Sequence, residues 1–178
     1  MVQVSMAMMV SIDGFIADEN GGLDWMHPHV GPQVQSVVLE ALQNCDGLLV
    51  GRVSYEGMAA FWPNESNPVA DLMNERPKAV FTRTLTETKW VNSRPVSGDL
   101  ADEVAALRKQ ATKDLLVLGG ANLVQSLTAE GLIDTYQFIT VPVVLGRGIP
   151  LFTEPMNLEL ESTTRMDGNA VMSVYRRV

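Results

Sequence analysis

The segment Leu115–Asn122 constrains the fold most, because a short apolar run is cut off there by two glycines and a helical pattern follows at once. Leu115–Leu118 has the length and apolar character of a strand buried on both faces of a sheet. Apolar residues then recur at helical spacing up to Gly131. Gly119 and Gly120 therefore mark a strand-to-helix turn, where the free N–H groups of a helix start can hold an anion such as a dinucleotide pyrophosphate. A plain tight turn is the alternative interpretation.

Two further strand ends carry groups that suit phosphate. The apolar run 48–50 leads into Gly51 and Arg52, and a helical pattern begins there. A cation in the first turn of a helix opposes the helix dipole unless an anion is bound, so Gly51 and Arg52 predict a phosphate clamp. The alternative is an Arg52 paired with a surface carboxylate. A third predicted strand, 78–82, ends at Thr82 and Arg83, which place a hydroxyl beside a guanidinium.

Composition and charge disfavour several classes of partner. The 178 residues fit a single domain, 1–178, with a substantial core. A formal net charge of −8 disfavours nucleic acid and anionic membranes, which both need a basic face. We find neither a signal peptide pattern nor an apolar stretch that spans a bilayer, so a cytoplasmic protein is expected. His27 and His29 lack accompanying ligand residues, and no metal site is predicted.

The remaining pattern predicts an alternation of strands and helices. Strands are expected at 2–10, near 90–91, and at 133–144, 158–164 and 171–178, and helices at 34–44, 69–74 and from residue 99. The turn 167–169 joins the last two strands as a hairpin.

A loop follows the first strand and has the composition of a lid. Its segment 18–22 is turn-forming and leads to Trp25, which is expected to cover a site or, alternatively, to plug the core edge. Asp13 is the candidate acid or substrate anchor, and a turn-capping role before Gly14 is the alternative. Trp25, Tyr55 and Phe61 are candidate walls of a substrate pocket, although core packing would also explain each of them.

Four ordered blocks resemble a known family. The chain resembles the dihydrofolate reductase-like fold, and more closely the RibD C-terminal domain, the reductase part of a riboflavin-biosynthesis enzyme, and its stand-alone bacterial relatives. The blocks are residues 11–17, 48–56, 117–121, and 132–134 with 141–146.

The resemblance implies an α/β three-layer fold, with a mostly parallel central sheet, an antiparallel C-terminal edge and helices on both faces. It also implies NADPH, with the glycine pair at the pyrophosphate, Gly51 and Arg52 at the phosphates, and Thr82 and Arg83 at the 2′-phosphate. The nicotinamide would be flanked by residues 16 and 17. In full, the implied cofactor contacts are Ile16, Ala17, Gly51, Arg52, Thr82, Arg83, Leu118, Gly119, Gly120, Ala121, Asn122 and Leu123.

We therefore expect an NADPH-dependent reductase of a small heterocyclic or ribose-derived substrate, similar to 5-amino-6-(5-phosphoribosylamino)uracil reductase. Dihydrofolate reduction is an alternative, disfavoured because the helix after the lid carries only Glu40, near its C-terminal end. A nucleotide-binding protein without turnover is a second alternative. The sequence departs from its relatives at Thr135, where they often have Glu. By analogy a homodimer is expected, with the apolar 141–145 region contributing.

Overall fold

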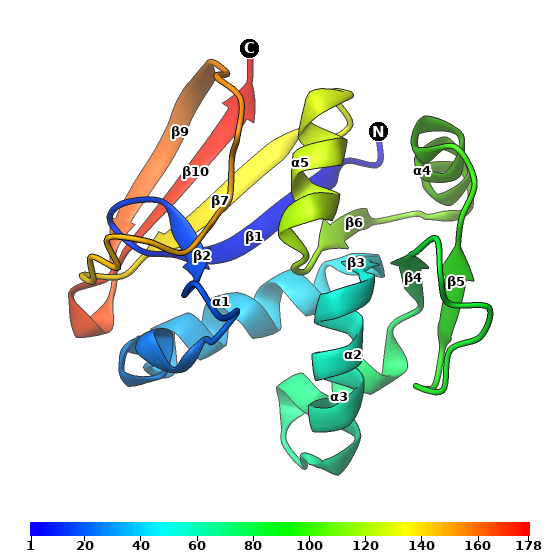
Figure 1. The fold of residues 1–178 in the computed structure, drawn as a ribbon, viewed down its shortest axis with the longest axis horizontal. Coiled ribbons are helices and arrows are strands. Elements are labelled where there is room, and N and C mark those ends of the chain that lie inside the picture. Colours follow the sequence, from blue (N-terminus) through cyan, green and yellow to red (C-terminus); the bar gives the residue numbers. More distant parts are fainter.

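A computed structural model describes residues 1–178 and contains an eight-stranded sheet in the order β5-β4-β3-β6-β1-β7-β10-β9 (Figure 1). The strands are β1 (Val4–Val10), β3 (Cys45–Gly51), β4 (Lys78–Phe81), β5 (Ser93–Val96), β6 (Asp114–Val117), β7 (Thr135–Thr140), β9 (Leu158–Arg165) and β10 (Val171–Arg177). The six strands from β5 to β7 run parallel, whereas β10 and β9 add an antiparallel edge.

The first strand lies at the centre of the sheet, which explains its nearly continuous apolar sequence. Met6 pairs with Val117 of β6 on one side and with Tyr136 of β7 on the other. All three residues are fully buried. A parallel strand covered on both faces has no solvent side, so it needs apolar residues at successive positions.

Helices cover both faces of the sheet (Figure 1). They are α1 (Pro32–Gln43), α2 (Arg52–Phe61), α3 (Pro68–Glu75), α4 (Leu100–Gln110) and α5 (Ala121–Ala129). The helices α1, α2 and α3 pack in one apolar cluster with Leu48 and Val50, whereas α4 and α5 pack in another with Leu49. Because side chains alternate along a strand, these clusters lie on opposite faces. The predicted α/β three-layer class is therefore confirmed.

Two predicted strands differ from the structure in their bounds, and the segment with the two histidines forms a helix that was not predicted. The small strand expected near residue 90 starts at Ser93, because Asn92 has a φ of 57°, which interrupts an extended backbone. Trp90 is instead buried, and its Nε1 donates to Asn74 Oδ1 at 2.7 Å. The strand β7 ends at Thr140, since Pro142 has no N–H for a ladder and a tight turn follows. The histidine loop forms a 3₁₀ helix, η1 (Asp24–His29).

A small second sheet joins two loops above the carboxyl end of β1. It consists of β2 (Phe15–Ala17) and β8 (Ile149–Pro150), which pair antiparallel. No helix has both the length and the apolarity required to cross a membrane.

Candidate functional site

Two helix starts meet at the carboxyl edge of the sheet. Gly51 ends β3 and precedes α2, and Gly119 and Gly120 link β6 to α5. A Cβ placed on Gly120 would lie 3.0 Å from the Cα of Gly51, so a side chain there would force one of the two backbones to shift by a few tenths of an ångström. Gly119 and Gly120 also have φ values of 88° and 93°, which side-chain-bearing residues rarely adopt. The glycines are thus required by both contact and conformation.

Both helix starts leave their first N–H groups without a side-chain partner. Neither the α2 nor the α5 N-cap accepts a side-chain hydrogen bond, and neither first turn holds an acidic residue. Each first turn therefore carries free N–H groups and the positive end of a helix dipole. Two such ends side by side form a backbone cradle of free N–H groups, the kind of arrangement that binds anions in proteins.

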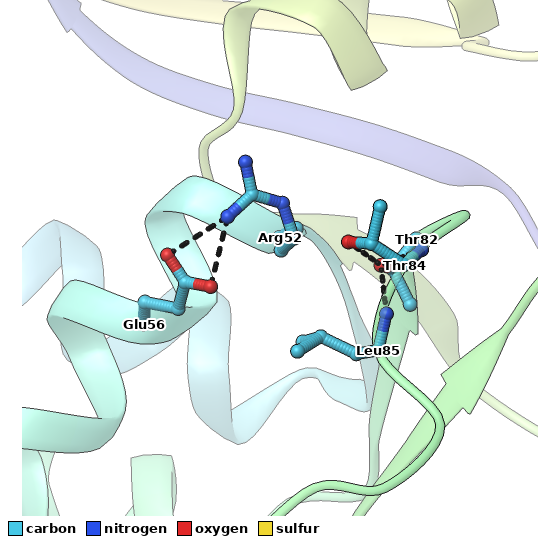
Figure 2. Close-up of polar contacts among 5 residues, drawn as sticks. All are labelled: Arg52, Glu56, Thr82, Thr84 and Leu85. Atoms are coloured by element: carbon cyan, nitrogen blue, oxygen red, sulfur yellow. Dashed lines mark hydrogen bonds and ion pairs between the residues drawn. The ribbon is translucent and has the colours of Figure 1, made fainter.

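The arginine at the start of α2 is paired with a carboxylate. Arg52 Nη1 donates to both Glu56 oxygens, at 2.9 and 3.1 Å, on the exposed side of the helix (Figure 2). This pair is the alternative that the sequence left open. It engages one terminal nitrogen, so the rest of the guanidinium has no protein partner. An exposed i,i+4 pair contributes only about 0.3–0.5 kcal/mol, which a phosphate group can readily replace.

The end of β4 lies next to this arginine, because Gly51 pairs with Phe81 in the parallel register. Thr82 is buried, and its Oγ1 accepts hydrogen bonds from the backbone N–H groups of Thr84 and Leu85, both at 3.1 Å (Figure 2). Thr82 therefore shapes the turn that presents Arg83. Arg83 is exposed and forms none of the six ion pairs in the structure.

The remaining residues assigned to the cofactor differ in accessibility. Asn122 is exposed and Ala121 half-buried in the first turn of α5, whereas Leu123 is buried beneath them. Leu118 is half-buried, and its N–H donates to Leu49 O of β3. Among these four residues, Asn122 is therefore the most accessible to a ligand, followed by Ala121 and Leu118.

The strand β2 holds the two residues assigned to the nicotinamide. Ile16 and Ala17 are only 8% and 5% exposed, and Ile16 belongs to the α4–α5 apolar cluster. Their side chains are buried in the interior, so a ligand would contact mainly their backbone atoms. Their contact with a nicotinamide stays a prediction.

Asp13 fastens two loops together. Its carboxylate accepts hydrogen bonds from Ser11 Oγ at 2.7 Å, Leu145 N at 3.2 Å and Gly146 N at 2.7 Å. The Ser11 hydroxyl and these backbone N–H groups hold the pKa of Asp13 below its ordinary value. The carboxyl is therefore ionised at neutral pH, which favours the turn-stabilising role over the proposed acid.

The three predicted pocket walls do not come together. Tyr55 is 5% exposed, and its hydroxyl accepts from Lys89 N and Trp90 N, so it is a core residue rather than a pocket wall. Phe61 lies nine residues after Arg52 in α2, about 13 Å along the helix axis from the cradle. Phe61 is 52% exposed and packs edge-on against Trp62, so its place in a substrate pocket stays a prediction. Trp25 packs on the apolar cluster between α1 and β7, with a buried Nε1 that has no partner.

Two residues near the site were not among those predicted. Ser54 Oγ lies 3.0 Å from where a Cβ of Gly119 would stand, in the first turn of α2. Its position three residues after the Gly51 N-cap places it in the first turn of α2, so the sequence could have indicated that it lies near the site. Gln137 lines a cavity under α1, and the signal was an amide at a central position of a predicted buried strand.

Comparisons with known proteins give the same architecture. The sequence model of the RibD C-terminal domain matches residues 2–172. The uncharacterized protein YyaP of Bacillus subtilis is 30% identical over 97% of this chain and 94% of its own length. The riboflavin biosynthesis protein RibD of Corynebacterium ammoniagenes is 22% identical over 97% of this chain, which spans 52% of that longer protein.

Solved structures agree with these sequence relatives. A Shewanella sp. PV-4 protein named for riboflavin biosynthesis superimposes with a TM-score of 0.82 at 26% identity, covering 99% of both chains. Dihydrofolate reductase of Enterococcus faecalis, solved with NADP(H), gives a TM-score of 0.66 at 17% identity over 98% of this chain and 96% of its own. The second likeness concerns the fold alone.

Proposed function

The chain belongs to the RibD C-terminal domain family, and on this basis we propose that it is an NADPH-dependent reductase of a small heterocyclic or ribose-derived substrate. Membership of this reductase family supports the reductase role. The observation that carries the cofactor proposal is the pair of uncapped helix starts held in contact at Gly51 and Gly120.

The residues at the sheet edge fit a dinucleotide phosphate. The first-turn N–H groups of α2 and α5 would hold the diphosphate, and Arg52 would neutralise part of its charge. Thr82 and Arg83 would hold the 2′-phosphate, which distinguishes NADPH from NADH. The overall charge of −8 leaves these local groups to supply the attraction.

The bound cofactor would supply the hydride, and the protein would supply orientation and exclusion of water. The β2–β8 sheet and the Asp13 hydrogen bonds fix the loops beside the end of β1. A role for Asp13 in proton supply is tested by Asp13→Asn, with Asp24→Asn in the exposed lid as the control. Retained NADPH binding with lost turnover would support that role, and unchanged turnover would leave Asp13 as a loop fastener.

The cofactor proposal is tested by titrating the protein with NADPH and NADH in a calorimeter. We expect NADPH to bind at least tenfold more tightly than NADH. If neither binds, the proposal is wrong. NADPH oxidation is then followed with a panel of pterins and pyrimidine riboflavin precursors, since oxidation separates an enzyme from a nucleotide-binding protein without turnover.

Dihydrofolate reduction is the second candidate function, suggested by the shared fold. The face of α1 toward the sheet carries Val34, Val37 and Val38, while Glu40 is exposed. No carboxylate on α1 is thus available to hold a pterin ring. We expect NADPH oxidation with dihydrofolate to be far slower than with the best pyrimidine of the panel.

We further propose a homodimer that acts on a small molecule rather than on nucleic acid or a membrane. Exposed Val144, Leu160 and Val171 lie on the loop after β7 and on the antiparallel edge, and they would gain from burial. Light scattering of the purified protein tests this, and a monomer mass would contradict it.

A further inference from the structure

The turn at residues 18–22, which we call the lid turn, contains the one Asn–Gly dipeptide of the chain, Asn20–Gly21. Both residues are exposed. Asn20 donates a hydrogen bond through its backbone N–H, whereas its side-chain amide has no protein partner. Gly21 has a φ of 82°, and a Cβ placed on it would meet nothing within 4 Å. Space is therefore available for a reaction between the Asn20 amide and the Gly21 nitrogen.

The chemistry open to an Asn–Gly pair is loss of the side-chain amide as ammonia. The Gly21 nitrogen forms a bond to Asn20 Cγ, and the bond from Cγ to Nδ2 breaks. Nδ2 leaves as ammonia together with the proton that the Gly21 nitrogen gives up, and a five-membered imide results. Water then adds to one of the two imide carbonyls and opens the ring, yielding aspartate or isoaspartate. Glycine favours the attack because no Cβ hinders the approach.

Asp18 restrains the nitrogen that would attack. Its backbone oxygen accepts a hydrogen bond from Gly21 N at 3.0 Å. Its carboxylate Oδ1 accepts from Asn20 N and Gly22 N, both at 2.8 Å. An aspartate that binds the backbone N–H groups following it in the chain stabilises a turn. Gly21 N becomes free only when the lid turn opens locally, so the hydrogen bonds of Asp18 oppose the reaction.

The other asparagines of the chain lack this combination. None of them is followed by glycine. Asn92 is also exposed and precedes the small residue Ser93, but its Nδ2 donates to Asn74 O at 3.1 Å and to Glu75 O at 3.0 Å. Asn92 is therefore the matched internal reference for Asn20.

We propose that Asn20 is a site of spontaneous deamidation and that the Asp18 hydrogen bonds limit its rate. The inference is independent of the proposed cofactor and substrate. Either product adds a carboxylate to a segment in which Glu19 Oε2 already lies 3.6 Å from Arg147 Nη1. Isoaspartate also inserts one carbon into the main chain between the two N–H groups that Asp18 Oδ1 bridges, so their spacing changes and the lid turn loosens.

Peptide mapping by mass spectrometry tests the site. The whole chain is incubated at mildly alkaline pH and physiological temperature, and each asparagine is followed over time. We expect Asn20 to lose its amide first, with isoaspartate among the products, while Asn92 keeps its amide. Retention of the Asn20 amide, or faster loss at Asn92, would overturn the proposal.

The variant Asp18→Ala tests the restraint. Loss of two hydrogen bonds of about 1 kcal/mol each makes the open turn more populated, so deamidation at Asn20 should be at least about fivefold faster. Asp24→Ala is the control, because it removes an exposed carboxylate from the same loop that accepts no backbone hydrogen bond, and its rate should equal that of the unmodified sequence. Equal rates in the two variants would contradict the role of Asp18.

The same reaction in guanidinium chloride separates the turn from the dipeptide. In the unfolded chain, Asp18→Ala and the unmodified sequence should deamidate at the same rate, and faster than the folded protein. A folded protein that reacts as fast as the unfolded chain would show that the turn gives no protection.

Hydrogen exchange measures the consequence for the lid turn. Protein enriched in isoaspartate should exchange faster at residues 18–22 than fresh protein, with the hairpin turn 167–169 unchanged. The variant Asn20→Asp carries the charge without the added carbon and should exchange like fresh protein. Unchanged exchange at residues 18–22 in the isoaspartate form would refute the loosening.

Discussion

The helices of this molecule begin in two different ways. Asn67 Oδ1 caps α3 by accepting from Ala70 N, and Asp99 Oδ1 caps α4 by accepting from Asp102 N; both first turns also carry acidic residues. The helices α2 and α5 begin at glycines, without a cap and without an acid. Since a good cap is worth about 1 kcal/mol, the second pair gives up stability. The difference marks the pair of helices that is open to an anion.

A third arrangement shows that a glycine start alone does not define a site. The helix α1 also follows a glycine, Gly31, and its own sequence supplies no cap. Asp167 supplies one instead: its Oδ2 accepts from Gln33 N at 3.0 Å, from 134 residues away in the chain. What distinguishes α2 and α5 is therefore that no carboxylate accepts from their first N–H groups, since Glu56 near the start of α2 binds the Arg52 side chain instead.

The largest effect is expected from Gly120→Ala, which should disrupt the contact between the starts of α2 and α5. The new Cβ would lie 3.0 Å from Gly51 Cα at a φ of 93°, so the cradle must open. We expect a loss of about 2 kcal/mol in the free energy of unfolding and at least tenfold weaker NADPH binding, by urea titration and calorimetry.

The matched control is Gly57→Ala in the middle of α2. A Cβ at Gly57 meets nothing within 4 Å, so this variant should gain up to about 1 kcal/mol of helix stability and bind NADPH normally. Equal NADPH affinity of the two variants would refute the cradle.

Arg83→Ala should affect the 2′-phosphate alone. We expect NADPH to bind about tenfold more weakly, equivalent to about 1.4 kcal/mol, and NADH binding to be unchanged. Arg94→Ala removes another exposed arginine, on β5, and should alter neither affinity. An equal loss for both cofactors would remove Arg83 from the 2′-phosphate site.

Asp99→Ala removes a cap from a helix that lies outside the cradle. The expected cost is about 1 kcal/mol in the free energy of unfolding, with NADPH affinity changed less than twofold. Urea unfolding and calorimetry measure the two quantities. A fall in NADPH affinity comparable to that of Gly120→Ala would contradict the proposal that the cofactor binds at the uncapped starts of α2 and α5 and not at capped helices.

Glu56→Gln should have the smallest effect, and in the opposite direction. Removing the carboxylate releases Arg52 from its exposed ion pair, which is worth about 0.3–0.5 kcal/mol. NADPH should then bind roughly twofold more tightly at low salt, with Glu65→Gln as an exposed control elsewhere. Weaker binding in Glu56→Gln would indicate that Glu56 positions Arg52 instead of competing for it.

Patterns within short windows predicted much of the fold. The apolar runs that form β1, β3 and β6 lack a polar face. This property identifies strands that are buried on both faces of a sheet. The Asp99 start of α4 and the turn at Gly168 were likewise local signals. The mostly parallel sheet with its antiparallel edge was implied by the family resemblance, whereas the strand order was not predicted, because pairing between segments more than 100 residues apart leaves no local trace.

Side-chain partners could not be predicted in the same way. Lys78 begins a strand like any surface lysine, yet it is 1% exposed and donates to Met73 O and Arg76 O near the end of α3. Its burial lowers the Lys78 pKa to about 8. The hydroxyl of Tyr55 is likewise occupied by a loop 34 residues away. Such contacts depend on how elements meet, so the candidate walls of the pocket were the least predictable part of the site.

The central position of β1 has a consequence for synthesis on the ribosome. The N-terminal strand pairs only with β6 and β7, so its first neighbour begins at Asp114 and its second at Thr135. At 5–20 residues per second, about 5–20 s pass between translation of β1 and of β6. Throughout that interval an apolar segment remains unpaired in the nascent chain. The first-synthesised strand is thus the part of the chain exposed longest to aggregation, and slower elongation would lengthen that exposure.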